Sequence, residues 1–305
     1  MWFKNARIYT VALDDGLKSI FNNETLLNEK IAAEQFKPTT QKEMSSCGFS
    51  PVFGRHTDAF VFSHDQNHFL RFTEENKLLP SSIVNQALAD EIDIREQELN
   101  RALKKSEKQA LKTALIDKMM AQAFTTRREL FMWINTRYGF VAVSASSAKR
   151  AENAITILRK ALTTFPAKSF QPRCVVEDRL TSFVATKELP ESFELGFDAV
   201  LKSNDDTGST VRVSKDDLTS NEVVSHIKAG KVITDLQLSF NHCAQFVLSA
   251  DLTVKRLTLD DQFLEHNLPQ PTDDKLADLQ ANVIIEGEVL TNLVAAISKA
   301  FDCDK

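Results

Sequence analysis

Five basic side chains between residues 101 and 112 have the type and spacing to bind phosphate. Their segment, RALKKSEKQALK, lies within a longer helical pattern. In a helix that turns about 100° per residue, the five fall within one arc of about 100°. Glu107 falls outside this arc, and leucine and alanine side chains occupy the opposite side. Such a face is either the binding site of a polyanion or a solvated surface. The five cations are Arg101, Lys104, Lys105, Lys108 and Lys112.

Two more basic pairs follow this segment. Arg127 and Arg128 are adjacent, and Lys149 and Arg150 fall in the first turn of a predicted helix. Cations at the start of a helix oppose its macrodipole, so a bound phosphate would explain their position. Phe residues are not interleaved with these cations, which favours contact with a duplex backbone over base stacking. The sequence has no recognition-helix motif for base-specific reading.

The charge of the chain is distributed unevenly. The 305 residues carry a formal net charge of −5, yet residues 101–160 contain 13 Lys or Arg and 4 Asp or Glu, a net of +9. The rest of the chain has a net of −14. This contrast fits a basic surface of an otherwise acidic protein, whether that surface is solvated or binds an anionic partner.

Motifs for catalysis and metal binding are missing from the sequence. It has no glycine-rich phosphate loop, no dinucleotide-binding turn, no nucleophile elbow and no helical H-E-x-x-H. His64 and His68 have a spacing that could hold a metal on a helix, but a turn is predicted between them. The four cysteines are widely spaced, as in a protein with reduced thiols. We therefore expect no catalytic residues, no metal site, no cofactor and no enzyme activity.

Hydrophobic periodicity predicts the elements that position the cations. The helical pattern from 83 to 123 is either one rod of about 60 Å or, with a break near Asp93, a helical hairpin. A proline-containing acidic stretch from 168 marks a domain boundary near 165–170. Strands and helices occur in separate runs, so the predicted class is α+β. Strands are predicted at 2–13, 59–63, 68–73, 130–136, 140–144, 232–240, 244–249 and 254–259.

Two further features concern the cellular location and the core. No apolar run approaches the roughly 20 residues that a membrane span needs, and the N-terminus lacks the pattern of a signal peptide. We expect a cytoplasmic protein without a membrane partner. Phe is abundant, with 21 copies, and most of these side chains are expected in the core.

Six segments in chain order resemble the RdgC family of bacterial recombination-associated proteins. They extend from Trp2 to about Val232, and the resemblance continues more weakly through the following strands. The segments are WFKN, LLPSSIVNQAL, RALKKSEKQALK, MWINT, SSAKRAENAITILRKAL and DLTSNEVVSHIKAGKV.

The resemblance implies a ring-shaped homodimer whose basic central hole surrounds double-stranded DNA. Each subunit would be a horseshoe of antiparallel sheets and helices. Its centre would comprise 1–80 and 117–167, its tip 81–116 and its base 168–305. Family members bind DNA with little sequence preference and oppose loading of the recombinase RecA, which implies a nucleoid-associated protein. Subunit-interface positions carry over to Phe124 and Lys215, and Asp216 stands where the family often has Gln.

Three hypotheses follow. In the first, the chain is a duplex-binding ring dimer, whose lumen would be lined by the nine cations named above. In the second, it is a protein-interaction scaffold whose basic face binds an acidic partner. In the third, it is a metal-dependent hydrolase that uses His64 and His68. The first predicts binding that weakens steeply with salt, the second a stoichiometric protein complex, and the third bound metal in the purified protein.

Overall fold

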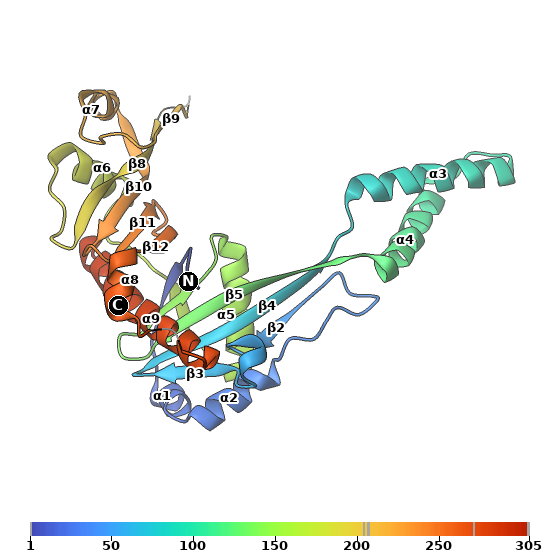
Figure 1. The fold of residues 1–305 in the computed structure, drawn as a ribbon. Coiled ribbons are helices and arrows are strands. Elements are labelled where there is room, and N and C mark those ends of the chain that lie inside the picture. The colour runs from blue at the N-terminus through green and yellow to red at the C-terminus, as the bar shows by residue number, and fades with distance from the viewer. Residues whose placement is uncertain (1, 204, 206–207, 271, 304–305) are drawn as a thin grey trace. The chain divides into compact units, whose positions relative to one another are not determined.

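The fold is described from a computed structural model, which covers residues 2–203, 205, 208–270 and 272–303 (Figure 1). The chain forms two compact units. Unit 1 comprises Met1–Glu34, Pro51–Arg71 and Leu130–Lys305, and unit 2 comprises Gln35–Ser50 and Phe72–Glu129. The expected tip, 81–116, lies within unit 2. The expected centre and base are not separate compact units, and the division into three regions stays a prediction.

The first sheet has seven strands in the order β2-β4-β5-β6-β1-β7, with β3 paired to β4. Its long strand β4 begins in unit 1 and ends in unit 2, and its long strand β5 begins in unit 2 and ends in unit 1. β1 lies antiparallel to β6, from Arg7 opposite Val143 to Thr10 opposite Phe140. The strands are β1 (Arg7–Val11), β2 (Ser45–Ser50), β3 (Val61–His64), β4 (Asn67–Lys77), β5 (Thr125–Asn135), β6 (Phe140–Val143) and β7 (Ala167–Ser169).

The second sheet belongs to unit 1 and has the order β12-β11-β10-β8-β9. Two helices, α6 (Val176–Thr186) and α7 (Asn221–Lys228), pack against β10. Backbone hydrogen bonds between Ala6 and Val254, at 2.8 and 3.0 Å, join the start of the chain to this sheet. The strands are β8 (Phe193–Ser203), β9 (Thr210–Val213), β10 (Lys231–Phe240), β11 (Ala244–Ser249) and β12 (Val254–Leu259).

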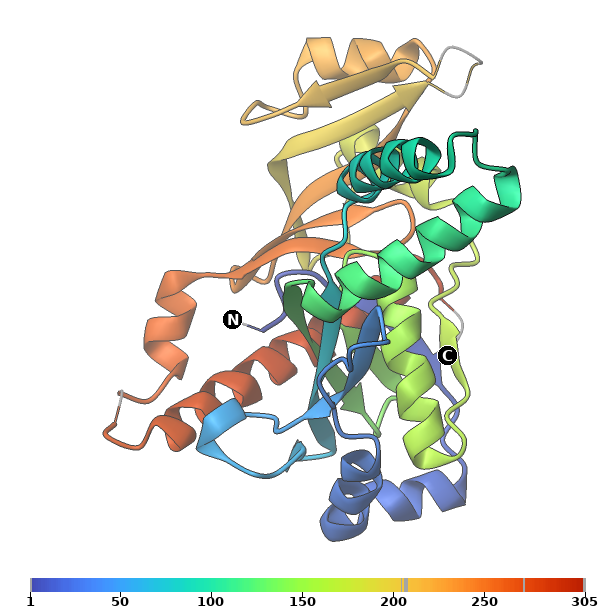
Figure 2. The same ribbon diagram turned by 90° about the vertical axis from the view of Figure 1, so that its right-hand side faces the viewer.

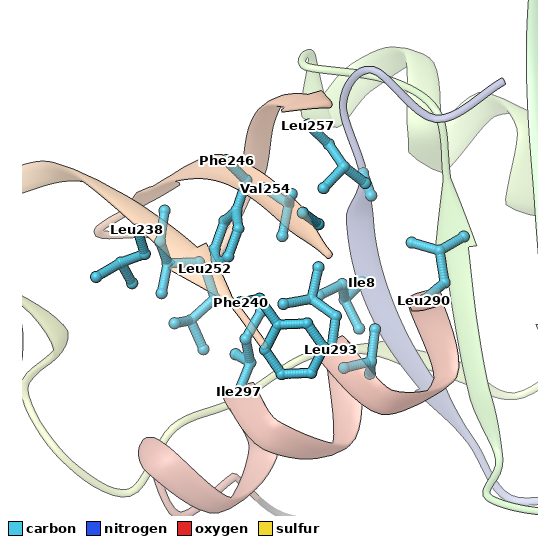
Figure 3. Close-up of a cluster of buried hydrophobic side chains, with 14 of the residues drawn as sticks. Ile8, Leu238, Phe240, Phe246, Leu252, Val254, Leu257, Leu290, Leu293 and Ile297 are labelled. Atoms are coloured by element: carbon cyan, nitrogen blue, oxygen red, sulfur yellow. The ribbon is translucent and has the colours of Figure 1, made fainter. Parts of the chain in front are cut away.

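The core of unit 1 is built around the long C-terminal helix α9 (Lys275–Ala300). Its Leu290, Leu293 and Ile297 lie among side chains that include Ile8 of β1 and Phe240 of β10 (Figure 3). By length and composition α9 could cross a membrane, but 56% of its most apolar window is buried inside the protein. Such burial is typical of the core helix of a globular domain.

Of the remaining helices of unit 1, three lie between strands of the first sheet in sequence, and the fourth, α8, follows β12 of the second sheet. α2 packs against α5, and Lys160 on α5 forms an ion pair of 2.8 Å with Glu34. α5 is strongly amphipathic, and its apolar face is buried. The helices are α1 (Asp15–Phe21), α2 (Glu24–Ala33), α5 (Ala148–Leu162) and α8 (Asp261–Asn267), with a short 3-10 turn at Gly54–His56.

Unit 2 carries a helical hairpin in place of a single rod (Figures 1 and 2). Its helices are α3 (Ser81–Leu99) and α4 (Lys105–Gln122). The expected break near Asp93 is wrong, because α3 continues to Leu99. Asn100 ends α3 in a left-handed conformation, with φ of 50°, and its N–H reaches the Gln97 carbonyl. Asn tolerates this conformation better than most residues, so it can cap a helix as glycine does.

The predicted α+β class is confirmed, with antiparallel pairing in both sheets. The predicted hairpin around residues 64–67 is also present as β3 and β4, which pair from Val61 and Leu70 to His64 and Asn67. β5 begins at Thr125, before the predicted start at Leu130. The horseshoe and the ring stay predictions.

Candidate nucleic-acid interface

The elbow between α3 and α4 pairs its cations with carboxylates. Arg101 forms two hydrogen bonds with Glu107, at 2.9 and 2.7 Å. Lys108 Nζ lies 3.0 Å from Oε1 of Glu96 on the opposite helix. The expectation of an acid-free arc from 101 to 112 is therefore wrong. It assumed one continuous helix, whereas the chain turns between Asn100 and Lys104 and brings these acids to the cations.

The same two carboxylates hold the backbone of the elbow. Glu96 accepts from the Leu103 N–H at 2.8 Å, and Glu107 accepts from the Lys104 N–H at 2.7 Å. The hydrogen bonds from the Arg101 side chain and from the Lys104 N–H lower the pKa of Glu107 to about 2. The Leu103 amide and Lys108 likewise lower the pKa of Glu96. Both groups therefore stay ionised at neutral pH and remain partners of the elbow cations.

Lys105 and Lys112 are the members of the predicted arc that keep free charges on α4. They are seven residues apart and so lie within about 20° of each other around the helix. Lys105 is exposed and Lys112 is half-buried. In the part of the chain that the structure describes, neither forms an ion pair or a side-chain hydrogen bond. Lys104 is exposed at the N-cap of the helix.

Arg127 on β5 is tied to a buried acid. Its Nε lies 2.6 Å from Glu75 Oε1, and its guanidinium lies 5.2 Å from the ring centre of Phe36. Glu75 is 2% exposed and also accepts from the N–H and hydroxyl of Thr39, at 2.7 and 2.8 Å. These bonds, the one from Arg127 foremost, lower the pKa of Glu75 to about 2. Arg127 is thus part of the structure of unit 2.

Arg128 has a different environment from its neighbour. Successive side chains of a strand point to opposite faces, so Arg128 points away from the face on which Arg127 meets Glu75. It is exposed, and within the described residues it has no ion pair. Of the adjacent pair, Arg128 is therefore the one available to an external anion.

The remaining predicted cations lie in unit 1, at the start of α5. Lys149 and Arg150 occupy the first turn after Ser147, whose side chain makes no capping hydrogen bond. The first turn contains no acidic residue. Lys149 is exposed and Arg150 is half-buried. The unfavourable placement of two cations at the positive end of a helix is thus present as predicted.

Phe124 presents an aromatic side chain to solvent. The side chain is 84% exposed, directly after the C-cap of α4. Its backbone is fixed, because the Phe124 carbonyl accepts from the Leu78 N–H at 2.7 Å. Nearby, the Lys77 ammonium donates to the Met120 carbonyl near the end of α4 at 2.8 Å. Unit 2 therefore holds an exposed Phe on an ordered backbone.

Lys215 and Asp216 lie in the turn that follows β9 in unit 1. Lys215 has a φ of 55°, and its N–H donates to Asp198 at 3.0 Å. The Asp216 N–H donates to the Phe197 carbonyl at 3.2 Å, and the Phe197 side chain is 63% exposed. Of the 21 Phe residues, all within the described part of the chain, Phe124 and Phe197 are the exposed ones. Phe124 is itself a predicted interface residue. Phe197 contacts the other predicted interface position, because its carbonyl accepts from the Asp216 N–H.

A family model described as "Putative exonuclease, RdgC" matches residues 1–303. The chain belongs to the RdgC family. Relatives named "Recombination-associated protein RdgC" align along nearly their whole length. The Shewanella loihica protein is 34% identical over 97% of this chain and 96% of its own. Those of Shewanella piezotolerans and Yersinia enterocolitica are 33% and 32% identical over 98% of this chain and 97% of theirs. The resemblance to RdgC proteins noted from the sequence is confirmed.

Several residues that shape the candidate sites of this RdgC chain were missed from the sequence. Glu107 follows Lys104 by three residues, the spacing of a helix-capping glutamate, which could have indicated its role. Glu75 and Glu96 carried no comparable pattern, because their partners come from other elements. Asp198 likewise had no sequence pattern that could indicate its partners. It accepts hydrogen bonds from Lys215, Ser214 and Arg256 because β8, β9 and β12 belong to one sheet.

The histidine pair does not form a shared site in this RdgC chain. His64 is exposed at the end of β3, whereas His68 is 4% exposed and its Nδ1 lies 2.9 Å from the Ser63 hydroxyl. Burial lowers the pKa of His68 to about 4. Among the described residues, no three His, Cys, Asp or Glu side chains gather as metal ligands would.

Proposed function

We propose that this chain is a recombination protein that binds double-stranded DNA without sequence preference, as a homodimer, and limits access of the RecA recombinase. The observation that carries the proposal is a group of four predicted cations that form no ion pair within the described residues. They are Lys105, Lys112, Arg128 and Lys149, and they lie between residues 101 and 160, the basic part of an otherwise acidic chain. Membership of the RdgC family, whose relatives are named for recombination, supports it.

The type of these cations favours contact with the phosphate backbone. Lys is a point charge on a flexible stem and binds phosphate without reading a base. Three of the four lie in unit 2, on α4 and β5, and Lys149 adds a charge at the start of α5. The proposed surface also includes Arg101, Lys104, Lys108, Arg127 and Arg150. Three of these, Arg101, Lys108 and Arg127, form ion pairs with carboxylates. They can contact phosphate only by sharing or exchanging that carboxylate.

The homodimer rests on the two exposed Phe regions. Burying a Phe side chain contributes about 1.5–3 kcal/mol, so an ordered Phe124 in water is a natural anchor for a second copy. Lys215, Asp216 and the exposed Phe197 are proposed as the second contact. Two separate contacts between two copies close a ring, which agrees with the horseshoe-shaped subunit proposed for the family's fold.

A ring around duplex DNA gives a physical reason for the charge distribution. Cations that line the lumen neutralise phosphate, while an acidic exterior keeps the net charge negative and discourages other nucleic-acid contacts. Duplex DNA enclosed by the ring is then unavailable to the recombinase. The protein would act in the cytoplasm, associated with the nucleoid. No resident cofactor enters this proposal.

The proposal is tested by measuring the dissociation constant for linear and closed circular duplex at several salt concentrations, together with the mass in solution. A dimer whose log K falls steeply with log[salt] supports it, because each neutralised phosphate contributes about 0.9 to the slope. A flat salt dependence together with a stoichiometric protein complex would instead support a scaffold with an acidic partner. End-labelled duplex incubated with Mg²⁺ tests the exonuclease that the family description names, since shortened strands would show that activity.

A further inference from the structure

The outer edge of β9 has unpaired backbone groups. Ser203 N–H donates to the Ser209 carbonyl at 2.9 Å, and the ladder continues with Leu201 opposite Val211 and Ala199 opposite Val213. Hydrogen-bonded and non-hydrogen-bonded pairs alternate in an antiparallel ladder. Thr210 and Arg212 therefore occupy the non-hydrogen-bonded positions, and their N–H and C=O groups point away from β8.

Nothing in the described part of the chain covers this edge. β9 ends the strand order of its sheet, and α7, the helix that follows, packs against α6 and β10. The strand reads TVRV and is rich in β-branched residues. It has no proline, and the edge is protected only by its length of 4 residues and the charge of Arg212. Val211 and Val213 pack on the core of unit 1 and remain half-exposed.

We propose that β9 pairs antiparallel with β9 of a second copy. The two five-stranded sheets then form one continuous sheet across the second contact of the proposed homodimer, the one at Lys215 and Asp216. The inference rests on the proposed homodimer and specifies how its second contact is made. A two-fold contact presents the same surface from both copies, and an antiparallel strand edge pairs with itself in this way. The Lys215–Asp216 turn directly follows β9, and Phe197 lies beside that turn.

One register satisfies the exposed groups best. With Val211 on the two-fold axis, Thr210 lies opposite Arg212 of the partner subunit, and four backbone hydrogen bonds form. Centring the pair on Arg212 would place two guanidinium groups directly opposite each other, which is unfavourable. Centring it on Thr210 would require the Gly208 N–H, which already donates to the Asp205 carbonyl at 3.1 Å. The first register also lets the two Val211 side chains cover each other.

A cysteine cross-link tests the pairing and its register. Residues on the axis form a non-hydrogen-bonded pair, about 4.5 Å apart at Cα, which is within the range of a disulfide. Val211→Cys should therefore form a covalent dimer under mild oxidation. Val213→Cys is the matched control, because residue 213 would lie roughly 13 Å along the strand from residue 213 of the second copy. We expect at least fivefold more covalent dimer from Val211→Cys than from Val213→Cys or the unmodified chain, with its native thiols. Equal yields would overturn the proposal.

A second pair of variants tests the backbone bonds. Arg212→Pro removes an N–H that faces outward, so the bonds to β8 are kept, as is usual for proline on an edge strand. Combined with Val211→Cys, it should lower the cross-link at least fivefold, whereas Arg212→Ala should not. Thr210→Pro has the same logic and serves if Arg212→Pro does not fold. Proline and alanine variants with equal yields would contradict the pairing.

The outcomes separate this inference from the proposed function. A dimer that binds duplex with a steep salt dependence but gives no Val211→Cys cross-link retains the function and loses the strand pairing. A strong cross-link in a protein that does not bind duplex retains the pairing and loses the DNA-binding role.

Discussion

The Arg127 guanidinium and the Glu75 carboxylate lie 2.6 Å apart at their closest atoms, and Phe36 lies against the cation. Two neighbouring strands, β4 and β5, bring these residues together although 52 positions separate them in the chain. The pair fixes the strand from which Arg128 projects. A cation that the sequence assigns to DNA is therefore first a structural element of unit 2.

Replacing Arg127 with Ala should destabilise the protein by about 1–3 kcal/mol, because the buried Glu75 loses its charged partner. Arg127→Lys, which keeps the charge but not the planar contact with Phe36, should cost less. Since the folded-state pKa of Glu75 is about 2, below its ordinary 4.5, its contribution is present above pH 4.5 and is lost as pH falls toward 2. Denaturant unfolding of the native chain and Glu75→Gln should converge over that window. Parallel curves would contradict this account.

Reversing the free charges on α4 should weaken duplex binding without unfolding the protein. Lys105→Glu with Lys112→Glu is expected to lower affinity at least tenfold and to reduce the salt slope by about 2, because two phosphate contacts are lost. The matched control is Lys228→Glu with Lys275→Glu, the same charge change on exposed residues of unit 1. Gel-shift titration at several salt concentrations measures both. Equal losses in the two variants would indicate only an effect of net charge.

Neutralising the acids of the elbow should have the opposite effect on binding. Glu107→Gln frees the Arg101 side chain from its ionic partner, and Glu96→Gln does the same for Lys108. Each variant should bind duplex a few-fold more tightly at low salt, with a steeper salt dependence. Glu98→Gln, which removes an exposed α3 acid that pairs with Arg95, is the control. Unchanged affinity in the first two would show that the elbow cations do not meet DNA.

Phe124→Ala should weaken the dimer while leaving the folded subunit intact. The side chain is 84% exposed and contributes little to the stability of one copy, so the melting temperature of the monomer should change little. Light scattering across a dilution series should show a dimer dissociation constant raised at least tenfold. Tyr138→Ala, a change at another exposed aromatic, is the control. A dimer of unchanged strength would remove Phe124 from the interface.

Stability of unit 1 should fall between pH 6.5 and pH 4 because of His68. Its folded-state pKa of about 4 lies below the ordinary 6.5, since burial disfavours the charged ring. Between these values the unfolded chain binds a proton that the folded chain does not, so stability decreases as pH falls, by at most about 3 kcal/mol. His68→Gln should flatten this part of the profile in denaturant unfolding. His64→Gln, on the exposed side of the turn, should leave it unchanged.

The sequence by itself determined the features that depend on neighbouring residues. Alternating apolar positions predicted the hairpin of β3 and β4, and helical periodicity predicted α5 at Ala148–Leu162. The two structural predictions follow from local pattern, because strand and helix periods depend on adjacent side chains. The family was predicted from the resemblance of six segments in chain order.

Tertiary structure alone decided which cations are free. The left-handed Asn100 decided between the two alternatives, rod and hairpin, in favour of the hairpin and brought Glu96 to Lys108, and the pairing of β4 with β5 brought Glu75 to Arg127. β5 begins at the exposed residues Thr125 to Glu129, whose pattern has no apolar alternation and which become a strand through pairing. A helical wheel places side chains around one axis only. The partners of a charge are set by where the chain turns and which strands lie side by side.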